Sequence, residues 1–350
     1  MRIHRWLGLA VGFVALAVAL SGAILVWAPA LDRIAAPARY RVSGGTRLVP
    51  QVYVTAARSA MAPGERIASL LLERGSSPVL VLLSDAQGQD RRLLFLDPPT
   101  ARVLGKGAHG GGASGWLRRL HDGLFLGGAG RAIVGVAGVV LVLLCLTGPW
   151  VRPRDGARRA TRKSEFWAAR WHWRIGLWSL PPVLVMTLTG TALAFPGLFA
   201  TLTGEAVAWQ SDRTAPPVAR TTLSVERVVA SARHEARGRL ISLDWPTQRS
   251  PDWTAHFEGP HVIKVADDSA TAVAAPERAV PASLSWVRRL HTARDMPWFW
   301  RAIASIMGLV AAMLAMTGLI SWATRPRNAP RRQTRSTRSR SVASRPKSSM

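Results

Sequence analysis

The sequence has almost no cysteine and few acidic residues. Cys145 is the single thiol in 350 residues, so the chain can form no internal disulfide and no cysteine-ligated zinc or iron–sulfur site. Twenty Asp and Glu stand against 46 Lys and Arg, which gives a net charge of +26, yet 48% of the residues are hydrophobic. Apolar and basic residues must therefore occupy separate parts of the chain. This disfavours a cytosolic enzyme, a disordered chain and a plain nucleic-acid binder.

Four long stretches hold most of the apolar residues, and they cover residues 6–29, 132–150, 175–196 and 302–323. A helix rises about 1.5 Å per residue and needs about 20 residues to cross a bilayer core of about 30 Å. Each stretch is therefore predicted to be a transmembrane helix in a lipid bilayer. The first one has features of a cleavable secretion signal, but its recurrence later in the chain favours a retained helix.

The distribution of basic residues predicts the orientation of these helices. Residues 1–5, 151–174 and 324–350 together hold 19 Lys and Arg against 2 acidic residues, whereas the long connections 30–131 and 197–301 hold 27 against 18. Because short cytoplasmic segments are enriched in Lys and Arg, both chain ends are expected in the cytoplasm and both long connections outside. The basic tail is expected to be disordered and to meet anionic lipid rather than nucleic acid.

The chain contains an internal repeat. HRWLGL at residues 4–9 corresponds to HWRIGL at 172–177, and the Ser-Gly pair at 21–22 corresponds to Thr-Gly at 189–190 with the same offset. WLRRLH at residues 116–121 corresponds to WVRRLH at 286–291, and Thr-Gly at 147–148 corresponds to Thr-Gly at 317–318. The chain is therefore predicted to be two copies of one unit, each a helix out, an external domain and a helix back.

Four of the eight histidines take part in the repeat. His4 and His172 precede the first and third apolar stretches, and His121 and His291 precede the second and fourth. The predicted topology therefore places one pair near each membrane face. From His4 to Gly22 the first helix rises about 27 Å, so the two pairs would need separate cofactors.

Two histidines on each face are typical of haem iron, which accepts two axial imidazoles, whereas zinc needs three or four protein ligands. Glycines at 8, 12, 22, 176 and 190 would leave room for a flat macrocycle. Six arginines next to these histidines would pair with the haem propionates, namely Arg5, Arg174, Arg118, Arg119, Arg288 and Arg289. The plainer reading treats the histidines as polar residues of the membrane interface, the glycines as packing positions and the arginines as headgroup anchors.

These motifs resemble the PepSY-associated transmembrane family, which includes periplasmic siderophore-iron reductases. The resemblance rests on HRWLGL at 4–9, the two RRLH motifs and the Thr-Gly pairs, and it covers roughly residues 1–326. Outside the helices, Ala-Pro-Gly at 62–64 and Leu-Asp-Pro-Pro-Thr at 96–100 are similar to a PepSY-type module of a helix followed by a sheet.

The resemblance implies a membrane all-α fold, a four-helix transmembrane bundle made from two tandem repeats, with two small α+β PepSY-like periplasmic domains. The expected divisions are 1–30, 116–151, 172–197 and 286–324 for the transmembrane helices with their external histidine segments, 31–115 and 198–285 for the periplasmic domains, 152–171 for a basic cytoplasmic loop and 325–350 for the tail.

The resemblance also implies an activity. The protein would be an inner-membrane oxidoreductase with two non-covalent haem b groups, held by His4 with His172 and by His121 with His291. Electrons would reach a periplasmic acceptor, with ferric siderophore favoured. The electron donor stays open between a quinol, a flavoprotein and a reduced carrier. The alternative is a membrane-tethered PepSY module that regulates or inhibits a periplasmic protease. Transport of the chelate is disfavoured because the sequence predicts no broken-helix pair, only a local kink at Pro181 and Pro182.

Overall fold

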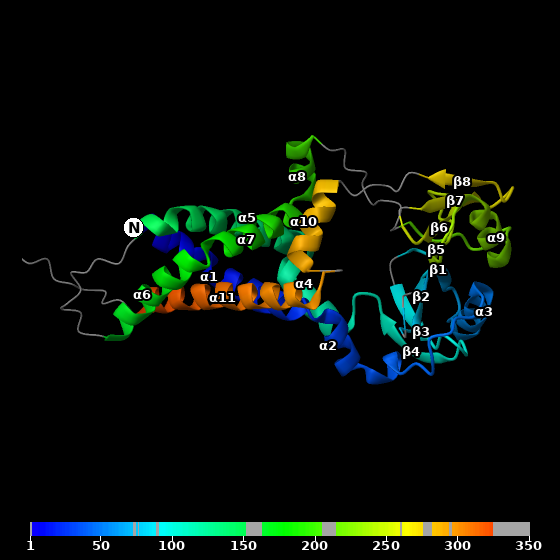
Figure 1. Ribbon diagram of the computed structural model, residues 1–350, viewed down its shortest axis with the longest axis horizontal. Coiled ribbons are helices and arrows are strands. Elements are labelled where there is room, and N and C mark those ends of the chain that lie inside the picture. The colour runs from blue at the N-terminus through cyan, green and yellow to red at the C-terminus, as the bar shows by residue number, and fades with distance from the viewer. Residues whose placement is uncertain are drawn as a thin grey trace, which may run out of the picture.

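The computed structural model has two parts, a body of long helices and a domain built on one β-sheet (Figure 1). The described residues are 2–72, 75, 77–88, 91–151, 163–204, 215–259, 261–275, 282–293 and 296–324. The predicted basic tail at 325–350 and residues 152–162 of the predicted basic loop lie outside them. The N-terminus lies at the end of the helical body away from the sheet. We call that end the distal end and the opposite one the sheet-side end.

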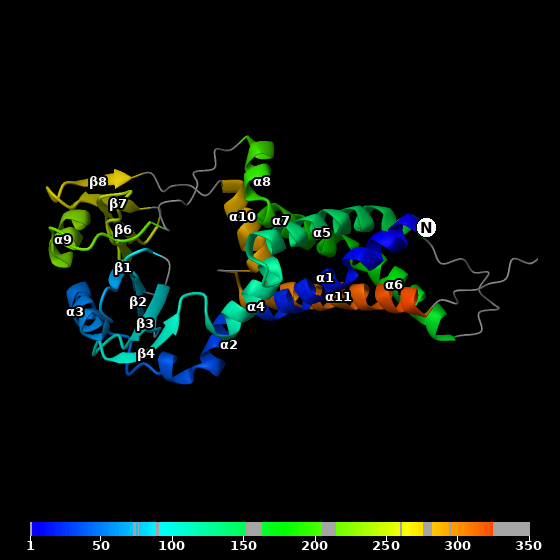
Figure 2. The same cartoon turned by 180° about the vertical axis from the view of Figure 1, so that it is seen from behind.

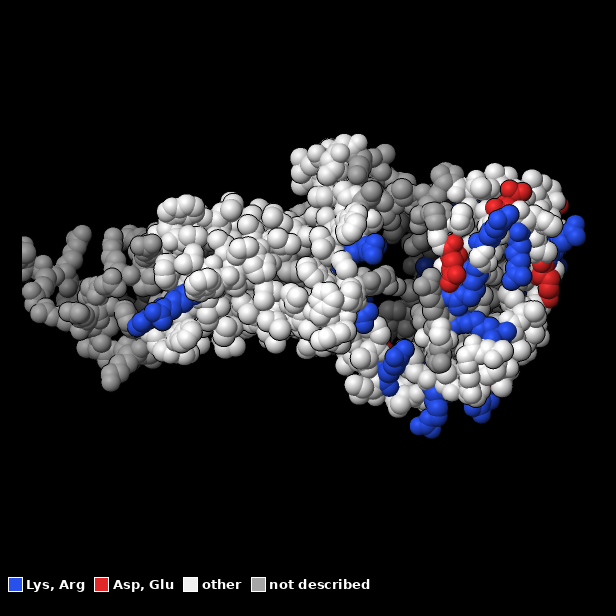
Figure 3. All heavy atoms as spheres, viewed as in Figure 1, with Lys and Arg blue, Asp and Glu red and all other residues white. Residues whose placement is uncertain are grey.

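Among the described residues, three helices of the body are long and apolar enough to cross a membrane, and a bent pair can count as a fourth span. The helices are α1 (Arg2–Leu25), α5 (Gly127–Thr147), α6 (Lys163–Trp178), α7 (Leu180–Ala194) and α11 (Trp298–Ala323). Large apolar side chains cover their outer surface, for example Phe13 and Leu309, which are 69% and 55% exposed. Figure 3 shows this surface almost free of charged side chains. Such a surface suits hydrocarbon, and the chain is a multi-pass membrane protein.

The third apolar stretch is broken. Helices α6 and α7 meet at Ser179 with a bend of 77° between their axes. Pro181 and Pro182 lie in the first turn of α7. They have no backbone N–H for the preceding turn, and their rings clash with a continuing helix, so α6 ends and a new helix begins. The prediction of a local kink without a broken-helix pair was therefore wrong.

The repeat determines how the helices pack. Helix α1 lies against α11, and α5 lies against α7, so each helix pair joins the two repeats. The two views in Figures 1 and 2 show α1 and α11 side by side. Gly138 of α5 packs on Thr191, and its repeat equivalent in α11, Gly308, packs on Ala23. Glycine at these equivalent crossings lets the backbones approach closely.

The strands of the two long connections form a single eight-stranded antiparallel sheet in the order β4-β3-β2-β1-β5-β6-β7-β8. The first connection supplies α3 (Pro50–Ala60), β1 (Arg66–Leu71), β2 (Val79–Ser84), β3 (Arg91–Leu96) and β4 (Val103–Ala108). The second supplies α9 (Val225–Glu235), β5 (Leu240–Asp244), β6 (Asp252–Phe257), β7 (Val262–Ala266) and β8 (Ala272–Ala275).

The two halves of this sheet share one hydrophobic core. Helices α3 and α9 contact each other and pack on the sheet, where Tyr53, Val228 and Trp253 are fully buried. Strands β1 and β5 pair in the middle, with Leu70 opposite Leu243. The two external segments, predicted as two small domains, are thus joined edge to edge.

Short helices connect the sheet domain to the helical body. They are α2 (Ala28–Ala35), η1 (Pro37–Tyr40), α4 (Gly112–Gly123), α8 (Pro196–Thr203) and α10 (Ala282–Thr292). The short helix η2 (Gly148–Trp150) lies instead at the distal end, where it follows α5 and contacts α6. Helices α4 and α10 carry the two RRLH motifs and lie at the sheet-side end of the body (Figure 1). They pack on α1 and α7, respectively.

Candidate functional site

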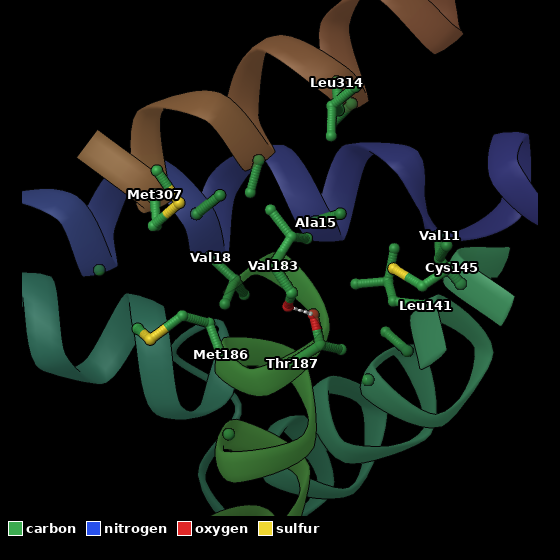
Figure 4. Close-up of a pocket in the computed structure, with 18 of the residues that line it drawn as sticks. Val11, Ala15, Val18, Leu141, Cys145, Val183, Met186, Thr187, Met307 and Leu314 are labelled. Carbon is green, nitrogen blue, oxygen red and sulfur yellow. Dashed lines mark hydrogen bonds between the residues drawn. The ribbon is translucent and has the colours of Figure 1, made fainter. Parts of the chain in front are cut away.

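A cavity of about 1250 Å³ runs along the inside of the helical body. It reaches from His4 and His172 at the distal end to His121 and His291 at the sheet-side end. Its middle is apolar, and Figure 4 shows Val18, Leu141 and Leu314 of three different helices facing one space. The volume exceeds the roughly 300–1,000 Å³ of a typical small-molecule site. The cavity is therefore larger than a typical site for one small molecule.

The sheet-side pair of histidines comes from the two repeats. The ring centroids of His121 and His291 lie 6.0 Å apart, and the rings are tilted by 40°. Two metal–nitrogen bonds of about 2 Å each, added to the two ring radii, span a separation of this order. The pair is thus spaced for one metal ion between two imidazoles.

Nδ1 of His121 is turned toward helix α1. It donates to the carbonyl oxygen of Val18 at 2.8 Å and lies 3.3 Å from the hydroxyl of Ser21. That hydroxyl itself donates to the carbonyl of Ala17 at 2.7 Å, so its oxygen is the acceptor toward the imidazole. The hydrogen bonds assign the proton of neutral His121 to Nδ1 and leave the lone pair on Nε2.

His291 repeats this arrangement on helix α7. Its Nδ1 lies 3.1 Å from the hydroxyl of Thr189, and the imidazole is also hydrogen-bonded to the backbone of Met186. Burial, together with the neighbouring His121, lowers the pKa of His291 to about 4, and burial also lowers the pKa of His121. Both imidazoles are therefore neutral at pH 7, the form that binds metals.

The distal pair has the same chemistry. Nδ1 of His172 donates to the carbonyl of Leu314 at 2.9 Å and lies 3.2 Å from the hydroxyl of Thr317. Nδ1 of His4 lies 3.3 Å from the hydroxyl of Thr147. Both hydroxyls donate to carbonyl oxygens one turn earlier in their own helices, at 2.8 and 2.7 Å, and so accept from the imidazoles. Both histidines line the distal end of the cavity.

Each of the four rings packs on the glycine that follows its hydroxyl partner. A Cβ atom would lie 2.7 Å from the ring of His121 at Gly22 and 2.9 Å from His291 at Gly190. The corresponding distances are 3.3 Å at Gly318 for His172 and 3.8 Å at Gly148 for His4. Among the described residues, none hydrogen-bonds to Nε2 of any of the four histidines. Each Ser/Thr-Gly pair of the repeat thus holds one histidine, with the hydroxyl bound to Nδ1 and the glycine packed on the ring. We call each such pair the seat of its histidine.

The donor set is two imidazoles at each end. Within the described part of the chain, no group of three or more His, Cys, Asp or Glu side chains could hold a metal ion. Structural zinc requires four protein ligands and catalytic zinc three, while six-coordinate haem iron takes two axial imidazoles and needs a flat cavity. The residues therefore fit a haem better than a zinc ion.

The structure divides the six arginines of the sequence prediction into two groups. Arg5, Arg118 and Arg288 line the cavity. Arg119 instead donates to the carbonyl of Gly110 at 3.0 Å, and the guanidinium of Arg289 lies 5.3 Å from the centre of the Trp286 ring. Arg174 is not among the lining residues. The first group alone is placed to contact a ligand in the cavity.

Two further arginines line the cavity but were missed in the sequence. Arg131 lies in the first turns of α5, and Arg301 lies at the equivalent place in α11. Both begin the tripeptide Arg-Ala-Ile, and the offset between them equals the offset between the two RRLH motifs. The repeat offset was the signal that would have found them.

The chain is similar to known proteins. The chain is 29% identical over 259 residues to "Uncharacterized protein PA4219" of Pseudomonas aeruginosa, a match that covers 61% of this chain and 64% of that protein. The match thus spans less than two thirds of the relative's length. The family described as "PepSY-associated TM region" matches residues 1–325, which include both repeats and all four paired histidines. The chain therefore belongs to the PepSY-associated transmembrane family.

Proposed function

We propose that this protein is a di-haem protein of the bacterial inner membrane, with both termini in the cytoplasm and the sheet domain in the periplasm. It carries electrons from the cytoplasmic side to the periplasm and reduces an acceptor there. The observation that supports this most directly is the fourfold arrangement of imidazoles. Each holds its Nδ1 proton against its own repeat and leaves Nε2 without a partner among the described residues, beside one shared cavity.

The proposal assigns His121 and His291 to one haem b and His4 and His172 to the other. Each haem, when bound, supplies a one-electron iron couple. The hydroxyls of Ser21, Thr147, Thr189 and Thr317 fix the orientation and tautomer of the rings. Partners of this kind raise the basicity of a metal-binding histidine and influence the potential of the site.

The helical body separates the proposed haem sites from water. The apolar lining of the cavity excludes water and lowers the local dielectric constant, which is one way in which a protein sets a haem potential. Two haems near opposite ends of a body that spans the membrane would let an electron pass from the distal haem to the sheet-side haem before it reaches the acceptor. The proposed donor is a quinol, a flavoprotein or a reduced carrier at the distal end.

The favoured acceptor is a ferric siderophore. Hard oxygen ligands hold ferric iron more firmly than the softer ferrous ion, so one-electron reduction weakens the chelate. The two connections that form the sheet domain carry more basic than acidic residues, 27 against 18, and this excess attracts anionic chelates.

Absorption spectroscopy tests the proposal. Protein purified in detergent from cells with ample haem is expected to show a Soret band, a sharp reduced α-band and two haems per chain. His121→Ala and His291→Ala are each expected to leave one haem, because the distal pair is intact. His109→Ala, in the sheet domain, is the matched control and should keep both. Two haems in either variant would show that the ligands are wrongly assigned, and a colourless wild type would favour the regulatory PepSY alternative.

A further inference from the structure

The sheet-side end of the cavity carries an arginine quartet, which we define as Arg118, Arg131, Arg288 and Arg301. Arg118 and Arg288 lie one turn before the histidines in α4 and α10, and Arg131 and Arg301 lie in the first turns of α5 and α11. Figure 3 shows basic side chains at this junction between the helical body and the sheet domain. The four positions are thus two repeat-related pairs at one end of the cavity.

Among the described residues, little negative charge faces the quartet. No hydrogen bond or ion pair joins any of its four guanidinium groups to another described residue. Asp122 is the single acidic side chain among the described residues that line the cavity. Its repeat equivalent is Thr292, so the acid belongs to one repeat while the arginines are present in both.

Membrane topology does not account for these arginines. They lie on the side assigned to the periplasm, where Lys and Arg are not favoured next to transmembrane helices. Their neighbours Arg119 and Arg289 have the same charge and the same repeat relation, but they contact Gly110 and Trp286 outside the cavity. The quartet differs from these neighbours because its four side chains line the cavity. A function inside the cavity therefore explains the quartet better than membrane orientation does.

We propose that the arginine quartet binds the carboxylates of a ligand seated in the sheet-side end of the cavity. A guanidinium offers a planar fork of donors that matches a carboxylate, and it stays charged at any relevant pH. The starts of α5 and α11 add the partial positive charge of helix N-termini on the same side. The carboxylates belong either to a porphyrin or to a free polycarboxylate; the first source rests on the proposed function, and the second does not.

The porphyrin source is tested by removing charge from the ligand. Apo-protein in detergent that carries His4→Ala and His172→Ala retains only the sheet-side pair. It is titrated with haemin and with haemin dimethyl ester, whose carboxylates are blocked. Haemin is expected to bind about tenfold tighter or more, the equivalent of one or two charge-assisted hydrogen bonds. Added Arg131→Gln and Arg301→Gln should lower the ratio several-fold, because half of the quartet is removed, whereas Arg119→Gln and Arg289→Gln should leave it unchanged.

The free source is tested with citrate in the wild-type apo-protein by calorimetry. Binding that is lost in the Arg131→Gln and Arg301→Gln variant, and retained in the Arg119→Gln and Arg289→Gln variant, identifies a soluble carboxylate as the ligand. This measurement needs no haem, so it still tests the quartet if the protein binds none and the electron-transfer proposal fails. Equal affinities for haemin and its ester together with no citrate binding would overturn the inference. An equal loss in both arginine variants would overturn it as well.

Discussion

At the scale of single residues, each candidate haem ligand depends on a small seat in a neighbouring helix. A hydroxyl and the glycine after it hold the imidazole, the first by accepting from Nδ1 and the second by leaving space for the ring. The four seats differ in tightness, because Gly22 and Gly190 touch their rings while Gly148 is more open. These differences allow one substitution, glycine to alanine, to be compared at a tight position, Gly22, and at an open one, Gly148.

Gly22→Ala is expected to displace His121. The new Cβ would lie 2.7 Å from Cε1 of the ring, closer than real Cβ contacts, and overpacking of this kind costs about 1–3 kcal/mol. We expect the sheet-side haem to be lost or bound about tenfold more weakly, since about 1.4 kcal/mol corresponds to a factor of ten. Haem stoichiometry and the reduced α-band provide the measurement.

Gly148→Ala is the control for this prediction. A Cβ there would lie 3.8 Å from the ring of His4, an ordinary van der Waals distance, so both haems should remain. Equal haem loss in the two variants would mean that general damage to helix packing, and not the seat of one imidazole, explains the effect.

At the scale of elements, the turn between β3 and β4 illustrates how a buried carboxylate organises the sheet domain. Asp97 accepts from the backbone and hydroxyl of Ser43 and from the hydroxyl of Thr100. Burial alone would raise the pKa of Asp97, but these hydrogen bonds and the charge of Arg102 keep it below its ordinary value. The carboxylate thereby ties the segment after η1 to the β3–β4 turn.

The sheet domain is accordingly expected to lose stability in acid. Because the folded pKa lies below the unfolded value of about 3.9, the contribution of Asp97 is complete above that pH and is lost as the pH falls through the folded pKa. Asp97→Asn should cost about 1–3 kcal/mol at pH 7 and flatten the acid limb of the stability curve. Chemical denaturation of the full chain in detergent, followed by amide exchange in β3 and β4, measures both effects. An unchanged pH profile in the variant would assign the acid sensitivity to other groups.

The elements also show which features could be predicted from the sequence. The spans 6–29, 132–150 and 302–323 fall on α1, α5 and α11, because length and apolar character are local properties. At Ser179 the sequence predicted only a local kink, whereas the helix axes bend by 77°. The size of a bend after two prolines depends on the helices packed around it, which the local sequence does not contain. The pairing of β1 with β5 joins segments that lie far apart in the chain, such as Ser69 and Asp244, and no local pattern encodes it.

The candidate site was predicted in part for the same reason. The four histidines and their Ser/Thr-Gly counterparts are marked by the repeat, and the structure brings them together. The sequence did not reveal that the hydroxyls hold the imidazoles, because this contact is made between helices. It also did not separate Arg118 from Arg119, since adjacent residues of a helix face different directions and only the packing decides which one meets the cavity.

At the scale of the whole molecule, the central sheet pairing joins the two repeats outside the helical body. Ser69 and Asp244 are opposite residues of β1 and β5, and the serine hydroxyl donates to the carboxylate at 2.6 Å. The pairing runs between strands that lie at the inner edges of two otherwise similar four-stranded halves. It fixes the relative position of the repeats independently of the transmembrane helices.

A disulfide tests this pairing. In a Cys145→Ser background, Ser69→Cys with Asp244→Cys should form an intrachain bond on mild oxidation, because opposite residues of antiparallel strands lie about 4.5–5.5 Å apart. Mass spectrometry of peptides from the monomer detects it. Ser69→Cys with Thr254→Cys is the control, since Thr254 lies opposite Asp244 on the next strand, beyond the reach of about 7 Å. Cross-linking of the control but not of the test pair would contradict the strand order.

Because α1 packs on α11 and α5 packs on α7, residues of both repeats meet inside the helical body. Each repeat seats its own histidines, but the rings that meet at the sheet-side end, His121 and His291, come from different repeats. One repeat expressed alone would therefore be expected to hold each of its imidazoles in place but to lack the facing histidine from the other repeat. Under the proposed function, a complete pair of axial ligands forms only where the two copies of the repeat meet, so the duplication supplied the second ligand of each proposed haem.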